Sequence, residues 1–397
     1  MKNDFLKYQA QTSPYPLGME ISHASGSYIY DTEGNAHLDF VAGVSACTLG
    51  HSHPEVVTAI KEQAEKYMHV MVYGEYAQSP ATNYAKLLAE NLPKPLEVTY
   101  LVNSGTEAIE GALKLARRFT GRSQIISAKS AYHGNTMGSL SLMDFEERKS
   151  VFRPLLPDIY HIRFNNEEDL EKITHKTACV ILETIQGGAG FIVPKNNYLK
   201  KVKKRCSEMG ALLILDEIQP GFGRTGKLFA FEHFNCTPDI LVIGKGMASG
   251  LPVGAFTSSK EIMHTLSEKP KMGHITTFGG NPVIAAASLA TLQVLMRTTL
   301  IEDTLKKEEL FKELLQHRQI KEIRGKGLML ALIMYSAEAA NELVLRAKEK
   351  NLILFWLLFE NKAVRISPPL TISNTEIREG CTTILNILNS LKTIVVN

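Results

Sequence analysis

The sequence predicts an α/β protein whose larger part is a mostly parallel sheet flanked by helices and whose smaller part is α+β. Between about residues 98 and 244, short apolar runs rich in β-branched residues alternate with helical patterns, as in parallel sheets covered on both faces. After residue 281 this alternation gives way to a mixture of helices and strands. At roughly 100–200 residues per domain, 397 residues suffice for two to four domains.

The expected strands of the larger sheet are the apolar runs 98–102, 124–128, 178–183, 211–216 and 239–244. A helix is expected over 197–209, because Tyr198, Val202 and Cys206 recur on one stripe while the Lys and Arg residues lie elsewhere. Gly210 is expected to end this helix, since glycine readily adopts the left-handed conformation that follows helix ends.

The C-terminal region is expected to begin with a helix over 283–296, for which Pro282 suits the first position. The further elements expected are a helix near 302–316, a strand pair within 324–334, a helix over 337–350, strands at 352–356 and 363–366, and a helix from 375. Near the N-terminus, a hairpin around the turn 32–35 is expected to pack on this region. The predicted division is an N-terminal segment at 1–45, a large domain at 46–290 and a small domain at 291–397.

Composition argues against several classes of protein. The chain has 44 Lys and Arg residues against 41 Asp and Glu, so no nucleic-acid partner is expected. The longest apolar run, 352–359, has eight residues, whereas a membrane-spanning helix needs about 20. Residues 1–16 lack the apolar core of a secretory signal. Because no apolar run is long enough to span a membrane, we expect no membrane association. The five widely separated cysteines form no disulfide framework or redox pair, so we expect a cytoplasmic protein with reduced thiols.

Polar residues follow the expected strands at the edge where ligands of open parallel sheets bind. Ser104, Gly105 and Thr106 come after strand 98–102 at a helix start, where backbone N–H groups and the helix dipole favour an anion such as phosphate. The same residues would also suit an ordinary helix cap with nothing bound.

An acid and a lysine follow two neighbouring strands. Asp216 ends strand 211–216 and Lys245 follows strand 239–244, so both are expected to face one pocket. They could form only a salt bridge. The glycines on either side of Lys245, however, would let a bulky group approach the backbone closely.

These features converge on pyridoxal phosphate, which requires a lysine, a carboxylate beside its pyridine nitrogen, an anion site and a flat side chain over its ring. Tyr132 or His133 could supply the flat group, although His133 could also be an ordinary loop histidine. Asp216 would keep the ring nitrogen protonated, and Lys245 would be the base that moves a substrate proton.

Five motifs carry a family resemblance: 50–54 (GHSHP), 103–108 (NSGTEA), 215–226 (LDEIQPGFGRTG), 243–246 (IGKG) and 276–282 (TTFGGNP). With them the chain resembles the class III, acetylornithine/ornithine-type aminotransferases of fold type I, from about residue 39 to 365. The resemblance implies that Gly105 and Thr106 hold phosphate, Tyr132 stacks on the ring, Asp216 pairs with its nitrogen, Gln219 contacts its hydroxyl and Lys245 bonds to the cofactor.

The resemblance also implies a homodimer and a substrate site. Thr277 would be a phosphate ligand donated to the second subunit, and Thr276 and Tyr73 would lie on the substrate side. Arg365 matches the arginine that binds a substrate carboxylate, for which its planar fork suits bidentate recognition. A structural ion pair at a strand end is the other interpretation of Arg365.

Two positions depart from the family pattern. Asn135 stands where many relatives have an arginine that binds a second carboxylate, and Gly188 stands where relatives commonly have a glutamate that masks the anchoring arginine. We therefore expect Arg365 to stay unmasked in both half-reactions and donor choice to differ from that for acetylornithine.

Two other interpretations are weaker. Residues 221–226 satisfy GxGxxG, but 216–220 separate them from the strand, and 227–231 do not resemble a helix start, so a nucleotide site is disfavoured. His51 and His53 lack a third ligand, so no metal is expected.

The sequence thus predicts a homodimeric aminotransferase that moves a terminal amino group from an ω-amino acid or acetylornithine/ornithine-like donor to a 2-oxo acid by a ping-pong mechanism. The alternatives are a decarboxylase or aminomutase on the same scaffold and an amine:pyruvate-type transaminase. A nucleotide-binding or scaffold protein without the cofactor would make Asp216, Gln219 and Lys245 coincidental.

Overall fold

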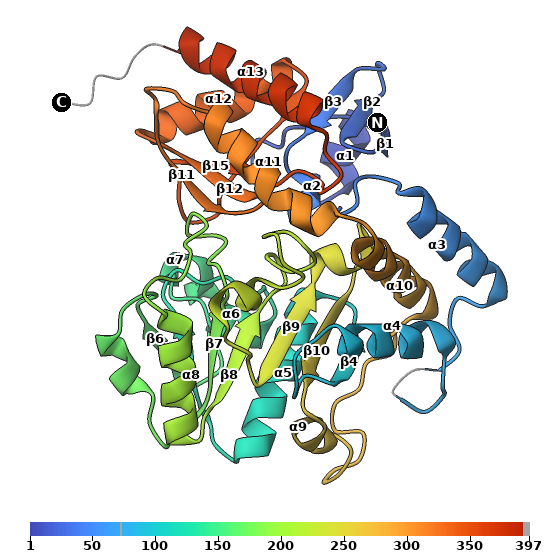
Figure 1. The fold of residues 1–397 in the computed structure, drawn as a ribbon, viewed down its shortest axis with the longest axis vertical. Helices are drawn as coiled ribbons and strands as arrows, with labels where there is room; N and C mark the ends of the chain where they lie inside the picture. The colour runs from blue at the N-terminus through green and yellow to red at the C-terminus, as the bar shows by residue number, and fades with distance from the viewer. Residues whose placement is uncertain (72–73, 392–397) are drawn as a thin grey trace.

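The computed structural model describes residues 1–71 and 74–391. It has a large α/β part built on one seven-stranded sheet and a smaller part built on two four-stranded sheets (Figure 1). In Figure 1 the smaller part, which holds both the first strands and the last helices of the chain, lies above the carboxyl ends of the large sheet's strands. The predicted α/β class with an additional α+β part is confirmed.

The seven-stranded sheet has the order β4 (Val98–Val102), β10 (Gly254–Ser258), β9 (Ile240–Gly244), β8 (Leu212–Asp216), β7 (Thr177–Glu183), β5 (Gln124–Ala128) and β6 (Ile159–Ile162). β10 runs antiparallel to both of its neighbours, β4 and β9, and the remaining neighbouring pairs are parallel. All five predicted strands are present. The sequence analysis missed β6 and β10, because edge strand β6 contains His161 and β10 contains four small or hydroxyl residues, which weakens the apolar pattern.

Helices cover both faces of this sheet. The longer ones are α3 (Pro54–Lys66), α4 (Ser79–Glu90), α5 (Gly105–Thr120), α8 (Tyr198–Met209) and α10 (Pro282–Arg297). The short ones are α2 (Ala42–Ser45), α6 (Met137–Ser141), α7 (Glu146–Lys149), α9 (Lys260–His264) and the 3-10 turns η1 (Ser150–Phe152), η2 (Glu168–Lys172), η3 (Ala230–Phe234) and η4 (Lys245–Ala248). Gly210 ends α8 in the left-handed conformation, and Pro282 is the first residue of α10, as predicted.

The C-terminal sheet has the order β11 (Ile320–Lys326), β12 (Met329–Met334), β15 (Ala363–Ile366) and β14 (Phe355–Trp356). Helices α11 (Leu300–Leu314), α12 (Ala337–Glu349) and α13 (Asn374–Ser390) pack with it. Among the described residues no single helix has the length and apolar composition to cross a membrane. Helices α10 and α11 meet those criteria only as a pair, bent by 72°.

The N-terminal sheet joins β1 (Ile21–Ser25), β2 (Tyr28–Asp31) and β3 (Ala36–Asp39) to β13 (Leu352–Ile353), after the short helix α1 (Lys2–Tyr8). The parallel pairing of β13 with β3 confirms that the N-terminal hairpin packs on the C-terminal region. It also corrects the prediction of one strand at 352–356. The run divides at buried Leu354, so that β13 and β14 enter different sheets. The domain boundaries at 45 and 290 stay predictions, and the second falls within α10.

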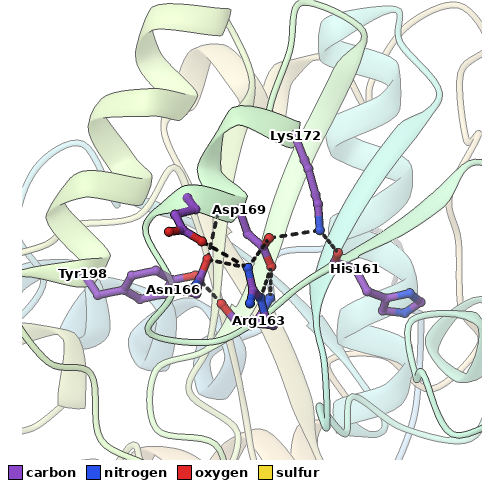
Figure 2. A network of polar contacts seen from close by, with 7 residues as sticks. His161, Arg163, Asn166, Asp169, Lys172 and Tyr198 are labelled. Carbon is purple, nitrogen blue, oxygen red and sulfur yellow. Dashed lines mark hydrogen bonds and ion pairs between the residues drawn. The ribbon is translucent and has the colours of Figure 1, made fainter.

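A polar network fixes the segment that follows edge strand β6 (Figure 2). Arg163 donates from Nε and Nη2 to the two carboxylate oxygens of Asp169, each at 3.1 Å, and Lys172 Nζ lies 3.1 Å from Asp169 Oδ1. Tyr198, the first residue of α8, donates its hydroxyl to the carbonyl of Arg163 at 3.3 Å. The network ties η2 and α8 to the edge of the sheet, away from the strand ends discussed below.

Candidate active site

A cavity of about 680 Å³ lies at the carboxyl ends of β7, β8 and β9, with residues 355–358 and β15 of the C-terminal part on its other side. It brings together most of the predicted site residues, namely Gly105, Thr106, Tyr132, His133, Asn135, Asp216, Gln219, Lys245 and Arg365. Ser104, Thr276 and Thr277 are not among the residues that line it. Tyr73 lies outside the described residues.

Helix α5 begins at the cavity wall. Ser104 caps it by accepting a hydrogen bond at Oγ from the Glu107 N–H at 3.3 Å, so its hydroxyl serves the cap that was the alternative interpretation. The hydroxyl of Thr106 lies 2.7 Å from those of both Thr136 and Ser139. The first N–H groups of a helix have no acceptor within it and carry the positive end of its dipole. An anion can therefore bind where Gly105 and Thr106 line the cavity.

Asp216 is buried at the end of β8 and held by two hydrogen bonds. His133 Nδ1 lies 2.8 Å from Asp216 Oδ2, and the backbone N–H of Ile218 donates to Oδ1 at 2.9 Å. Since the imidazole of His133 is bound edge-on to this carboxylate, it orients Asp216. The sequence analysis offered Tyr132 and His133 as the flat side chain over the cofactor ring. Since His133 binds Asp216, Tyr132 remains the candidate for that role.

Glu183 is a site residue that the sequence analysis missed. It ends β7 in parallel register with Asp216 on β8, and it accepts backbone hydrogen bonds from Gly187 at 2.9 Å and Tyr132 at 3.1 Å. Burial raises the pKa of Glu183 to about 7, and the neighbouring Asp216 adds to the shift. The signal that identified Asp216, an acid at a strand end, was present here too.

Lys245 follows β9 with a φ of 43°, in the left-handed region that residues other than glycine rarely adopt. No hydrogen bond or ion pair joins its side-chain amine to any described residue, so the predicted alternative of a salt bridge with Asp216 is not formed. Burial lowers the pKa of Lys245 to about 8, helped by the charge of Arg365 and opposed by Asp216 and Glu183. The amine is thus placed for reaction rather than for a structural pair.

Gly246, one of the two glycines beside Lys245, allows close packing within the protein. A Cβ added to Gly246 would lie 2.2 Å from the Thr48 hydroxyl, so the close approach expected there is made by Thr48. Gly105 is needed for a similar reason, because its Cβ would meet Ile218 Cδ1 at 2.8 Å.

Arg365, on β15, is a buried cation without a carboxylate partner in the described chain. Its side chain lies against the Phe191 ring, 5.4 Å from the centroid, while Nε and Nη1 have no hydrogen-bond acceptor among the described residues. Burial lowers the pKa of Arg365 to about 10. A buried, unpaired guanidinium is costly unless an anion joins it. The structural ion pair that was the alternative is therefore not formed.

The two departures from the family pattern also lie in the cavity wall. Asn135 Nδ2 donates to the Tyr132 hydroxyl at 3.3 Å. The carbonyl of Gly188 accepts a hydrogen bond from the Phe359 N–H at 2.9 Å, and a Cβ at position 188 would lie 2.8 Å from the Phe359 ring. That ring occupies the space beside Gly188.

The GxGxxG segment lacks the geometry of a dinucleotide site. Residues 218–225 form successive turns and 226–229 a bend, and they are followed by the 3-10 turn η3 rather than by an α-helix. The Arg224 side chain is buried and donates to the carbonyls of Leu328 and Pro368. The loop therefore joins the large part to the C-terminal part.

Comparison with known proteins decides the family. A family model described as "Aminotransferase class-III" matches residues 8–388. The chain belongs to the class III aminotransferases. These are pyridoxal phosphate enzymes, so this aminotransferase is a transaminase that uses pyridoxal phosphate on the fold type I scaffold.

Individual relatives act on different amines. The aminotransferase is 36% identical over 388 residues to the acetylornithine aminotransferase of Methanopyrus kandleri, which covers 97% of both chains. It is 37% identical over 401 residues to the putrescine aminotransferase of Pectobacterium atrosepticum, covering 96% of this chain and 84% of the relative. The crystal structure of the ornithine aminotransferase from Toxoplasma gondii superposes with a TM-score of 0.91 at 31% identity, covering 98% of this chain and 95% of that one. Such similarity leaves the donor open.

The residues of the cavity fit the cofactor. An anion site at α5, an oriented buried carboxylate and a lysine amine without a partner in the described chain lie around one cavity. These are three of the four features that pyridoxal phosphate requires of a protein, and Tyr132, in the same cavity, is the candidate for the fourth, the flat side chain.

Proposed function

We propose that this aminotransferase is a homodimer that transfers a terminal amino group from an ω-amino acid or acetylornithine-like donor to a 2-oxo acid by a ping-pong mechanism. The observation that carries the proposal is the cavity in which Lys245, oriented Asp216 and unpaired Arg365 meet. A cytoplasmic location, suggested by the five cysteines, stays a prediction.

The cofactor would be held by residues from several strand ends. In this assignment Gly105 and Thr106 bind its phosphate and Tyr132 stacks on its ring. Asp216 faces the ring nitrogen, Gln219 the ring hydroxyl, and Lys245 bonds to the aldehyde carbon. When bound, pyridoxal phosphate supplies an electron sink for the charge left when a substrate proton departs.

The protein's own groups would bind substrate and move the proton. Lys245, with its lowered pKa, accepts a proton at Nζ from the substrate carbon that carries the amine and returns it in the other half-reaction. Asp216, oriented by His133, stabilises a proton on the ring nitrogen opposite it. Arg365 binds a substrate carboxylate with its fork.

Donor choice would depend on Arg365 remaining accessible. No side chain at Gly188 is available to mask it, and Phe359 fills the adjacent space. We therefore expect donors other than acetylornithine to be used. The similarity to a putrescine aminotransferase supports donors whose far end carries no acid.

The dimer is supported by residues outside the cavity. Thr276 and Thr277 do not line their own chain's cavity, which fits donation of Thr277 to a partner's site. Exposed apolar residues lie near them in what we call the 68/278 patch, made of Met68, Val70, Ile275 and Phe278. The segment with Met68 and Val70 adjoins the segment with Ile275 and Phe278, because Asn281 Nδ2 donates to the Met68 carbonyl at 2.9 Å.

Half-reactions followed by cofactor absorbance would test the proposal. A panel of acetylornithine, ornithine, 4-aminobutyrate and simple diamines is expected to convert the cofactor to its amine form, and a 2-oxo acid is expected to restore the aldehyde form. Turnover without any 2-oxo acid would indicate a decarboxylase or aminomutase instead. A strong and unique preference for acetylornithine would refute the proposed donor choice.

A further inference from the structure

A second arginine, which the sequence analysis did not single out, lines the cavity at its exposed mouth. Arg148, on the short helix α7, donates from Nη2 to the Leu358 carbonyl at 3.3 Å, and its guanidinium carbon lies 5.4 Å from the centroid of the Phe359 ring. No carboxylate of the described chain pairs with it. The cation is therefore positioned by an aromatic face and one carbonyl, with most of its donors free for a ligand.

The Phe359 ring, which lies beneath Arg148, can pack closely against position 188 because Gly188 has no side chain. Phe359 packs against Gly188, where a Cβ would come within 2.8 Å of the ring, and it stacks on Phe145 at 4.3 Å between centroids. The Phe359 N–H donates to the Gly188 carbonyl. Gly188, Phe359 and Arg148 thus form one packed unit at the cavity wall.

Arg148 also lines a second, smaller recess beside the cavity. A recess of about 260 Å³ adjoins the cavity and is lined by Tyr132, Asn135, Met143, Arg148 and Leu358. Asn135 therefore shares this recess with Arg148. Arg148 is the one cation among the residues that line the recess.

The wall between the two arginines is mostly apolar. Phe355, Trp356, Leu357 and Leu358 line the cavity beside Arg365 and Arg148. Phe355 pairs with Arg365 across the sheet, and the Leu358 carbonyl accepts a hydrogen bond from Arg148, so the run 355–358 leads along the cavity wall from one arginine to the other. A ligand with an acid at each end and methylene groups between them would meet one cation at each end of this apolar wall.

We propose that Arg148 is a specificity-determining residue that binds the distal carboxylate of a dicarboxylic 2-oxo acid while Arg365 binds the other carboxylate. This inference rests on the proposed amino transfer to a 2-oxo acid. Phe359 is a positioning residue that holds the guanidinium of Arg148 in the recess.

The test compares Arg148→Met with the wild-type enzyme in the second half-reaction. 2-Oxoglutarate carries two carboxylates and pyruvate one. The variant is expected to lower kcat/KM for 2-oxoglutarate about 10-fold or more and to leave pyruvate within about 3-fold, because a charge-assisted hydrogen bond is lost for one substrate only. Arg153→Met is the matched control. Arg153 lies five positions along the same segment, pairs with Glu146 at 2.7 Å and does not line the cavity.

A binding measurement separates recognition from chemistry. Calorimetric titration with glutarate and with butyrate is expected to show that Arg148→Met raises the Kd of glutarate alone, about 10-fold, and that Arg148→Lys restores part of the affinity. Phe359→Leu is expected to weaken glutarate binding in the same direction but less.

The outcomes distinguish the two proposals. Equal losses for 2-oxoglutarate and pyruvate, or no loss for either, would overturn the role of Arg148 while leaving the aminotransferase reaction intact. A wild-type enzyme that restores its cofactor with neither acid would instead overturn the proposed acceptor class.

Discussion

At the scale of single residues, the pKa of Lys245 makes the amine reactive. With a pKa of about 8, about one molecule in ten carries a neutral amine at pH 7, against roughly one in 2,500 at an ordinary lysine pKa near 10.4. Only the neutral amine attacks a carbonyl. Burial, helped by the charge of Arg365, thus raises the neutral fraction of this amine at pH 7 by about 200-fold.

This predicts a pH dependence for cofactor uptake. The rate at which the cofactor-free protein takes up pyridoxal phosphate should rise with pH up to about 8 and level off above it, because Lys245 deprotonates over that range. Stopped-flow absorbance between pH 6.5 and 9.5 would measure this rate. A rate that goes on rising tenfold per pH unit to pH 9.5 would show that the lysine pKa is not lowered.

The sequence could identify residues whose position follows from strand ends. Asp216, Lys245 and Arg365 each lie in or directly after a strand whose apolar pattern is clear, and all three line the cavity. Arg148 could not be found in this way, because its place depends on Phe359, more than 200 positions away. The partnership of His133 with Asp216 likewise depends on contacts between separate strand ends.

At the scale of elements, an ion pair fixes the chain between β3 and α3. His51 Nε2 lies 2.8 Å from Asp39 Oδ2, and Asp39 Oδ1 accepts the N–H groups of Val41 and Ala42. Hydrogen bonds to Asp39 and then Cys47 raise the pKa of His51 to about 10. Such a histidine stabilises the fold fully below its unfolded pKa of about 6.5, and this contribution is lost as pH rises through 10.

His51→Gln should therefore destabilise the protein more at pH 7 than at pH 10. At pH 7 the expected loss in the free energy of unfolding is about 1 kcal/mol, since the pair is partly exposed. Urea unfolding at the two pH values would measure it. His53→Gln is the control, because no carboxylate of the described chain pairs with His53. An equal loss at both pH values for His51→Gln would contradict the assignment of a charged histidine.

Contact between Gly188 and Phe359 joins the large part to the C-terminal part. Gly188→Ala should lower the free energy of unfolding by about 1–3 kcal/mol, because its Cβ would overlap the ring. In a Phe359→Leu background the same change should cost clearly less, and a double-mutant cycle by urea unfolding would measure the coupling. Additive losses would show that the ring does not occupy this space.

Element prediction succeeded where the apolar pattern was clear and failed where small or polar residues interrupted it. The missed strand β10 is as long as most of the predicted strands, but it contains glycine, threonine and serine and lies between two antiparallel partners. The division of 352–356 between two sheets follows from how the N-terminal hairpin packs on the chain, which local pattern does not encode.

At the scale of the whole molecule, the site exists only because the C-terminal part closes over the large sheet. Strand ends supply Asp216 and Lys245, while β15 supplies Arg365 from more than 100 residues later. The sequence predicted both parts and their separate site residues. It could not predict that Leu357 and Leu358 complete the cavity wall, because their place depends on contacts with residues distant in sequence, such as Arg148.

The proposed dimer is a property of the same scale. Sedimentation of the holoenzyme should give twice the 44.0 kDa chain mass, and Phe278→Asp should shift it toward the monomer by charging the 68/278 patch. The monomeric variant should also bind pyridoxal phosphate more weakly if Thr277 is donated across the interface. A wild-type monomer with full cofactor affinity would contradict the shared site.

Reduction of the purified holoenzyme with sodium borohydride, followed by peptide mass mapping, tests the central claim most directly. Because borohydride fixes the cofactor to the amine that holds it, the expected result is one modified residue, Lys245, with no modification in Lys245→Ala. Attachment at another lysine, or no attachment in the active wild-type enzyme, would contradict the site described above.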